Sequence, residues 1–169
     1  MRQGLVVGLV GAAGWGFGSP ALAATCPSGL LCAAQPEAIV HSLQVQGYKA
    51  VLGKAENSGN PKISTSASGY NYSIFFYGCT KGEDCNSLGF SITFDDDGTN
   101  SAELANEWNK AKRFSAMSFD GQDKSLSITY DVTTVGGLTE VNFGDVVDWW
   151  QTMLGQARVF FEAHPAPKR

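Results

Sequence analysis

The chain of 169 residues carries 12 basic and 16 acidic side chains, which gives a formal net charge of −4 at pH 7. No basic stripe is present, and this argues against nucleic acids and anionic membrane surfaces as partners. The length suits one domain of ordinary size, with enough residues to bury a substantial core.

The first residues have the composition of a secretory signal. Arg2 precedes an apolar run from Gly4 to about Phe17, and Ala21-Leu22-Ala23 follows as a small-residue cleavage site. This pattern predicts a signal peptide over residues 1–23 and therefore an exported, periplasmic protein. The apolar run is too short and too rich in glycine to span a membrane, and no later stretch approaches the ~18 apolar residues that a span requires.

The four cysteines fall into two pairs, each with five intervening residues: Cys26, Cys32, Cys79 and Cys85. In an oxidising compartment this arrangement favours two disulfides. Of the three possible connectivities the local one, Cys26 with Cys32 and Cys79 with Cys85, fits best. The first pair would staple a loop over residues 24–35. Zinc is the alternative, although five intervening residues exceed the spacing usual in zinc sites.

The next segments alternate between helical and extended patterns. Pro36 starts a helix that extends to residue 46, with Gly47 after its end, and strands are expected at 48–54 and 62–67. Asn100 and Glu103 form a capping box that starts a second helix, whose buried stripe extends to Ala111. Two strands at 114–119 and 124–132 follow, and Thr139 is the expected N-cap of the longest helix, which continues to His164.

The centre of the chain is a predicted β-hairpin over residues 70–94. If Cys79 lies opposite Cys85, Phe76 faces Leu88 and Ile74 faces Phe90 on one surface of the hairpin. The other surface then carries mostly small polar side chains, together with Phe75 opposite Gly89. A shift of one residue would destroy this separation, so the hydrophobic pattern and the disulfide select the same register.

These elements predict an α+β fold in the order α-β-β-β-β-α-β-β-α. Strands that alternate between apolar and polar residues form an antiparallel sheet that is covered on one side, so all three helices should pack on the same face. The predicted organisation is a stapled loop at 24–35, a single domain at 36–164 and a flexible tail at 165–169.

Two short motifs resemble a known family. Residues 75–80, Phe-Phe-Tyr-Gly-Cys-Thr, and residues 105–114, Ala-Asn-Glu-Trp-Asn-Lys-Ala-Lys-Arg-Phe, resemble the YbjN-like family of bacterial sensory transduction regulators. The resemblance implies a fold similar to class I type III secretion chaperones, which are small, non-catalytic and usually dimeric binders of partner proteins. It therefore implies a protein partner and a homodimer, and it transfers no catalytic residue.

The outer face of the hairpin is the preferred site for a partner protein, because it combines hydroxyl groups with two aromatic rings. Trp149 lies a third of a turn away from the buried stripe of the last helix, so it is expected at a partner surface, whereas Trp108 and Trp150 belong to the core. Asn106, Asn109 and Arg113 form a polar row that is expected to face solvent. The predicted partner-binding residues are Ser73, Phe75, Tyr77, Ser91 and Trp149.

No set of residues suggests catalysis or a bound cofactor. His41 and His164 lie far apart in sequence, and no motif for a nucleophile or a phosphate-binding loop occurs. The acidic run at 95–97 could hold calcium, but position twelve of an EF-hand loop starting at Asp95 would be Asn106 instead of glutamate. The main interpretation is an exported interaction or regulatory module, chaperone-like, with a role in envelope signalling. The alternatives are an envelope hydrolase acting on glycan or cell-wall material, and a carrier of a small ligand or metal.

Overall fold

The computed structural model describes residues 26–166, so the predicted signal peptide and residues 167–169 of the predicted tail lie outside the described part. Within it the predicted order of elements is confirmed. The elements are α1 (Pro36–Val45), β1 (Val51–Lys54), β2 (Pro61–Ala67), β3 (Tyr70–Tyr77), β4 (Ser87–Phe94), α2 (Ala102–Ala111), β5 (Ala116–Phe119), β6 (Leu126–Thr133) and α3 (Glu140–Ala163).

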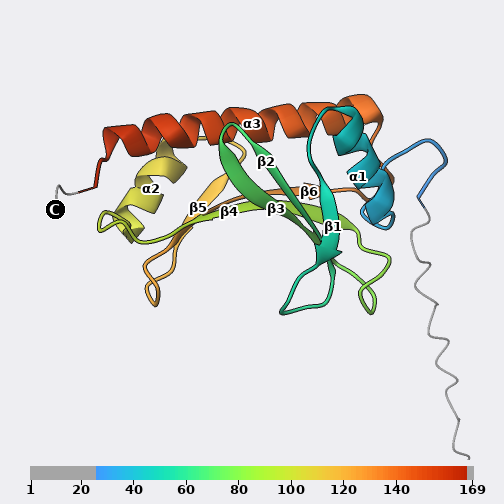
Figure 1. The fold of residues 1–169 in the computed structure, drawn as a ribbon, viewed down its shortest axis with the longest axis horizontal. Coiled ribbons are helices and arrows are strands. Elements are labelled where there is room, and N and C mark those ends of the chain that lie inside the picture. The colour runs from blue at the N-terminus through green and yellow to red at the C-terminus, as the bar shows by residue number, and fades with distance from the viewer. Residues whose placement is uncertain (1–25, 167–169) are drawn as a thin grey trace, which may run out of the picture.

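The six strands form one antiparallel sheet in the order β1-β2-β3-β4-β6-β5. All three described helices lie on the same face, as predicted, and α3 runs across the length of the sheet (Figure 1). The sheet is arched, and the β1–β2, β3–β4 and β5–β6 loops project on the side away from the helices, the first two at one end of the sheet and the third at the other. We call this uncovered side of the sheet the outer face.

The central hairpin has the predicted register. Phe76 pairs with Leu88, and Ile74 pairs with Phe90, both on the side that faces the helices. Both local disulfides, Cys26–Cys32 and Cys79–Cys85, are present. The second of them closes the loop just beyond the last paired residues of β3 and β4, so it holds the two strands together where the hydrogen-bonded ladder ends.

The core lies between the sheet and α3. Trp150 is fully buried, and the centroid of its ring lies 5.5 Å from that of Tyr72 and 5.7 Å from that of Phe90. Trp108 of α2 is also fully buried and packs edge to face on Phe160 of α3. The two tryptophans therefore belong to the core, as predicted; Trp150 packs α3 on the sheet, and Trp108 joins α2 to α3.

One predicted helix cap is confirmed and the other is wrong. The Asn142 amide donates to the hydroxyl of Thr139, which is the N-cap of α3. The N-cap of α2 is Ser101, whose hydroxyl accepts from the Leu104 amide, and not Asn100. The Asn100 side chain is engaged elsewhere, because it donates to the carbonyl oxygens of residues 94, 95 and 124 and so ties the end of β4 to the start of β6.

A side chain of α2 forms hydrogen bonds with the outer edge of strand β5. The Met117 amide donates to Asn109 Oδ1 over 2.8 Å, and Asn109 Nδ2 donates to the Met117 carbonyl over 2.9 Å. One amide side chain thus reproduces the pair of bonds that another strand would make. An unpaired strand edge invites further pairing and aggregation, so Asn109 protects this edge instead of merely facing solvent.

Candidate functional site

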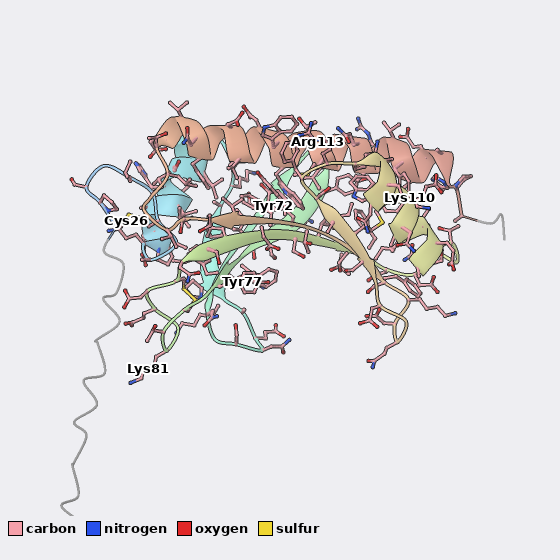
Figure 2. The ribbon with its side chains drawn as sticks, turned by 180° about the vertical axis from the view of Figure 1, so that it is seen from behind. Cys26, Tyr72, Tyr77, Lys81, Lys110 and Arg113 are labelled. Carbon is pink, nitrogen blue, oxygen red and sulfur yellow. A yellow bond between two sulfur atoms is a disulfide. The ribbon has the colours of Figure 1, made fainter. Side chains whose placement is uncertain are left out.

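The structure brings four of the five predicted partner-binding residues together on the outer face. Ser73, Phe75 and Tyr77 alternate along β3, and Ser73 pairs directly with Ser91 of β4. Figure 2 shows Tyr77 on the opposite side of the sheet from Tyr72, which lies between the sheet and α3. The strict alternation of a β-strand places these side chains on one surface.

A glycine lets Tyr77 lie close to the sheet. A Cβ atom on Gly89 would lie 2.6 Å from Tyr77 Cε2 and 2.8 Å from Asp131 Oδ1, distances that no real side chain could keep. The tyrosine ring therefore occupies the space above a bare backbone, while 48% of the residue remains exposed. Partial burial, and then the Asp131 carboxylate, raise the pKa of the Tyr77 phenol above its usual value, so the hydroxyl keeps its proton at neutral pH.

The two aromatic residues form one wall of a cleft. The ring centroids of Phe75 and Tyr77 lie 6.4 Å apart, and the cleft beside them has a volume of about 470 Å³. Lys62 of β2 and the β1–β2 loop, over residues 55–58, complete the lining. The cleft thus combines an aromatic wall with the Lys62 cation, the Glu56 carboxylate and the polar side chains of the loop.

A second hollow of about 360 Å³ lies further along β2 and β3. It is lined by Lys49 and by residues 64–66 and 71–73, most of which are serine, threonine or asparagine. Because Lys62 pairs with Phe75 and Ser64 pairs with Ser73, the two hollows lie in adjacent positions along the same pair of strands. Residues 64, 66, 71 and 73 alternate with the buried Thr65 and Tyr72, so their polar side chains lie on the outer face. The outer face is therefore aromatic at one end and rich in polar side chains at the other.

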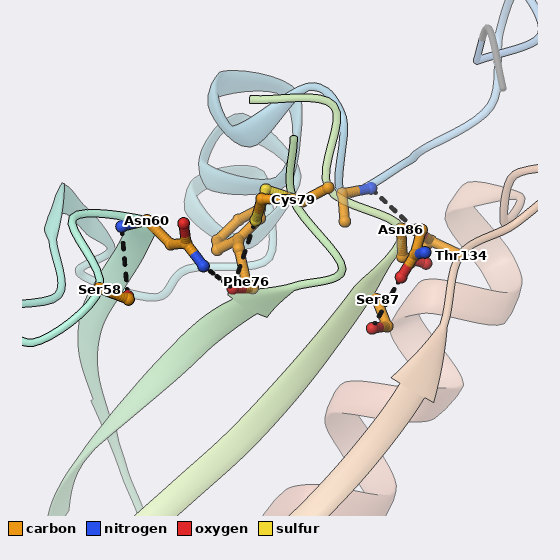
Figure 3. The surroundings of a disulfide bond; sticks show 9 residues. Ser58, Asn60, Phe76, Cys79, Asn86, Ser87 and Thr134 are labelled. Carbon is orange, nitrogen blue, oxygen red and sulfur yellow. Dashed lines mark hydrogen bonds between the residues drawn. A yellow bond between two sulfur atoms is a disulfide. The ribbon is translucent and has the colours of Figure 1, made fainter. Parts of the chain in front are cut away.

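The loops beside the cleft are held by side-chain hydrogen bonds (Figure 3). Asn60 Nδ2 donates to the Phe76 carbonyl over 3.3 Å, which fastens the β1–β2 loop to β3. The Thr134 hydroxyl donates to the Asn86 carbonyl over 3.0 Å, and the Cys79–Cys85 disulfide closes the same loop. Phe75 and Tyr77 therefore sit on strands whose ends are fixed, and this pre-organises the aromatic wall.

Trp149, the fifth predicted residue, lies elsewhere. It belongs to α3, on the helical side of the sheet, and 40% of it is exposed. Its ring contacts that of Phe114, with centroids 4.6 Å apart and the ring planes tilted by 43°, and the guanidinium carbon of Arg113 lies 4.9 Å from the centre of the Phe114 ring. The sequence analysis missed Phe114 as a partner of Trp149. The only feature of the sequence that pointed to Phe114 was its position at the end of the second motif that resembles the YbjN-like family.

The residues considered for metal or catalytic roles are separated. No group of three or more His, Cys, Asp or Glu side chains in residues 26–166 is arranged to hold a metal ion. In the acidic loop, Asp97 accepts from the Thr99 hydroxyl and amide, and these bonds lower the pKa of its carboxyl group. His164 Nε2 lies 3.2 Å from Glu107 Oε1 and its Nδ1 lies 2.8 Å from the Phe160 carbonyl, so this histidine links α2 to the end of α3.

The helices of the described part include none with the length and apolarity needed to cross a membrane.

The fold and the uncovered outer face define a small α+β module with one side of its sheet free for contact. Comparison with known protein families identifies the class of protein more closely. A family model described as "Putative bacterial sensory transduction regulator" matches residues 35–163, so the chain belongs to the YbjN family.

A solved structure supports the fold. The crystal structure of YbjN from E. coli, described as "a putative transcription regulator", superposes with a TM-score of 0.57 at 14% sequence identity. The match covers 76% of this chain and 91% of the E. coli chain. None of the curated proteins compared with the chain matches it. At this identity the comparison establishes the shared fold, which confirms the expectation drawn from the two motifs.

Proposed function

We propose that this chain is a non-catalytic regulatory module that binds a partner protein through its outer face. One observation carries the proposal. The helices cover one side of the sheet only, and the other side bears a fixed aromatic pair, Phe75 and Tyr77, beside a cleft of about 470 Å³. Membership of a family described as regulators supports a binding role.

The composition of this surface suits a protein contact. Aromatic residues are enriched at the centres of protein interfaces, where they bury a large area at little cost in conformational entropy. The hydroxyl groups of Ser73 and Ser91 lie at directly paired positions beside the aromatic wall and can satisfy polar groups of a partner. Lys62 and Glu56 at the cleft add one charge of each sign, which can orient a partner.

The proposal is tested by capturing partners from an envelope extract with the mature, oxidised protein. The double variant Phe75→Ala/Tyr77→Ala is expected to capture the partner at least about tenfold less well, because two aromatic contacts at the centre of an interface contribute roughly 2 kcal/mol or more. Both side chains are partly exposed, so circular dichroism and the melting temperature should change little.

A matched control lies on the same face. Thr93 and Ser127 share a hydrogen bond of 2.8 Å between their hydroxyl groups, away from the cleft. The variant Thr93→Ala/Ser127→Ala should retain capture of the partner. If the aromatic double variant binds as well as the wild type, the assignment of the outer face is wrong. If neither protein captures a partner, the interaction proposal itself fails.

We also propose that the protein acts in the periplasm, in envelope signalling, and that it forms a homodimer like the chaperones whose fold the family resembles. Two disulfides within residues 26–85 are consistent with an oxidising compartment. The mature protein should begin at Ala24, and mass spectrometry of the periplasmic fraction would show whether it does. Light scattering of the purified protein would give the molar mass and hence the number of chains.

A further inference from the structure

A second surface lies away from the outer face and consists of three side chains in contact. Arg113, Phe114 and Trp149 form a column in which the guanidinium group covers one ring and that ring contacts the next, at 4.9 and 4.6 Å. Phe114 is 47% exposed and Trp149 is 40% exposed. Arginine, tryptophan and other aromatic residues are the types that most often dominate the binding energy of protein interfaces.

Phe114 is held in an unfavourable backbone conformation. Its φ angle is +68°, in the left-handed region, where a bulky side chain is a genuine outlier. The residue lies between α2 and β5, in the short connection where Ser115 is already buried and Met117 is bound to Asn109. A glycine could make the same turn without a steric penalty. Strained positions of this kind tend to cluster at binding sites, so the retention of a large exposed ring here points to a role in binding.

The same segment gathers positive charge. Lys110, Lys112 and Arg113 fall within four consecutive positions of a chain that has more acidic than basic residues. In the described part of the chain, none of the three has a carboxylate oxygen within the 4.0 Å of an ion pair. Figure 2 shows Lys110 on α2, and the guanidinium group of Arg113 lies over the Phe114 ring. We call Lys110, Lys112, Arg113, Phe114 and Trp149 the aromatic–basic patch.

We infer that the aromatic–basic patch binds an acidic peptide segment of a partner protein, with an aromatic or aliphatic side chain of that segment packed against Phe114 and Trp149. Charge complementarity selects an acidic segment, since the Arg113 guanidinium covers the Phe114 ring and Lys110 and Lys112 precede it in the same segment, Lys112 with its ammonium group over the Trp108 ring. Asp145 and Asp148 lie on α3 within one turn of Trp149, so the acidic side chains of the segment are expected on the α2 side of the patch, beside Arg113. A bilayer presents anionic groups over its whole surface and would also meet these two carboxylates, whereas a peptide can place its acidic side chains on one side only. The inference is independent of the proposed role of the outer face.

The test uses a display library of random twelve-residue peptides, selected on the full oxidised protein. Enriched peptides should be acidic and contain an aromatic or aliphatic residue, and the variant Arg113→Glu should bind them at least about tenfold more weakly. The variant Lys81→Glu makes a comparable change of charge on an exposed loop far from the patch and should bind them like the wild type (Figure 2). Enrichment of neutral or basic peptides, or equal binding by both variants, would overturn the inference.

A second variant separates binding from folding. Phe114→Gly removes the ring and releases the left-handed strain, so the melting temperature should be retained or raised while peptide binding is lost. Full binding by Phe114→Gly would show that the strained ring has no role in recognition and would contradict the inference. The double variant Phe75→Ala/Tyr77→Ala should still bind the selected peptides, so the two proposed surfaces can fail separately.

Vesicles containing phosphatidylglycerol form the last arm of the experiment. The wild type should not sediment with them at physiological salt. Sedimentation that is lost in Arg113→Glu, with no enrichment of acidic peptides, would assign the patch to a membrane surface and overturn the peptide inference.

Discussion

Replacing Trp150 by alanine is expected to lower the free energy of unfolding by about 3–5 kcal/mol. The side chain is fully buried between β3, β4 and α3, where its ring contacts Tyr72 and Phe90. Its removal leaves a cavity under the centre of the sheet that the fixed strands cannot close, so both the apolar contacts and the packing are lost. Equilibrium unfolding in urea, followed by circular dichroism, measures the change.

The adjacent tryptophan is a matched control. Trp149 is 40% exposed and contacts Phe114 at the surface of the molecule. Trp149→Ala should therefore lower the free energy of unfolding by only about 1 kcal/mol. The same chemical change at neighbouring positions of α3 thus gives two very different effects. Equal costs for the two variants would mean that α3 is rotated from the position described above.

Replacing Asn109 by alanine is expected to cost about 1–3 kcal/mol and to promote association of the protein. Its side-chain amide is paired with both the amide and the carbonyl of Met117, and their loss leaves two backbone groups of a half-covered strand without partners. The exposed edge of β5 would then be free to pair with another chain. Unfolding in urea measures the stability, and light scattering against concentration measures the association.

Two further substitutions sharpen this prediction. Asn109→Asp keeps the acceptor for the Met117 amide but places a carboxylate against the Met117 carbonyl, so it should be as damaging as alanine. Asn106→Ala changes an exposed residue one turn earlier on α2 and should alter stability by no more than about 0.5 kcal/mol. If Asn109→Ala is as mild as Asn106→Ala and remains dispersed, the edge is protected by something other than Asn109.

The central hairpin could be predicted because two separate signals in the sequence specify it. The apolar residues at alternate positions and the spacing of Cys79 and Cys85 demand the same register, and the paired residues agree with it. The burial of Trp108 and Trp150 followed from helical spacing in the same way. In each of these cases the information is local, because the residues that decide the structure are neighbours in the chain.

The failures arise where a side chain binds a backbone group that the sequence patterns do not indicate. Asn100 has the chemistry of a helix cap, but its amide is taken by the backbone of residues 94, 95 and 124, so Ser101 caps α2 instead. The first strand was predicted to start at 48 and starts at Val51, since the Ala50 carbonyl accepts from the Gln44 side chain of α1. Sequence spacing contains no signal for either interaction.

The residues of the candidate binding sites could likewise be predicted only where local sequence patterns place them. Ser73, Phe75, Tyr77 and Ser91 could be grouped because strand alternation and the hairpin register place them on one face. Trp149 was assigned to the same set only because it was expected to be exposed. Its actual neighbour, Phe114, comes from the connection between α2 and β5, and nothing in the separation of these residues along the chain indicates that they meet.

The central claim, that the uncovered outer face binds the partner, is tested most directly by site-specific photo-crosslinking in cells. A benzoylphenylalanine in place of Ser91 would lie in the middle of the outer face, whereas one in place of Val159, which is 62% exposed on α3, would lie on the helical side. We expect a crosslinked partner from position 91 and none from position 159. A crosslink from position 159 alone would contradict it, because binding would then take place on the helical side of the molecule.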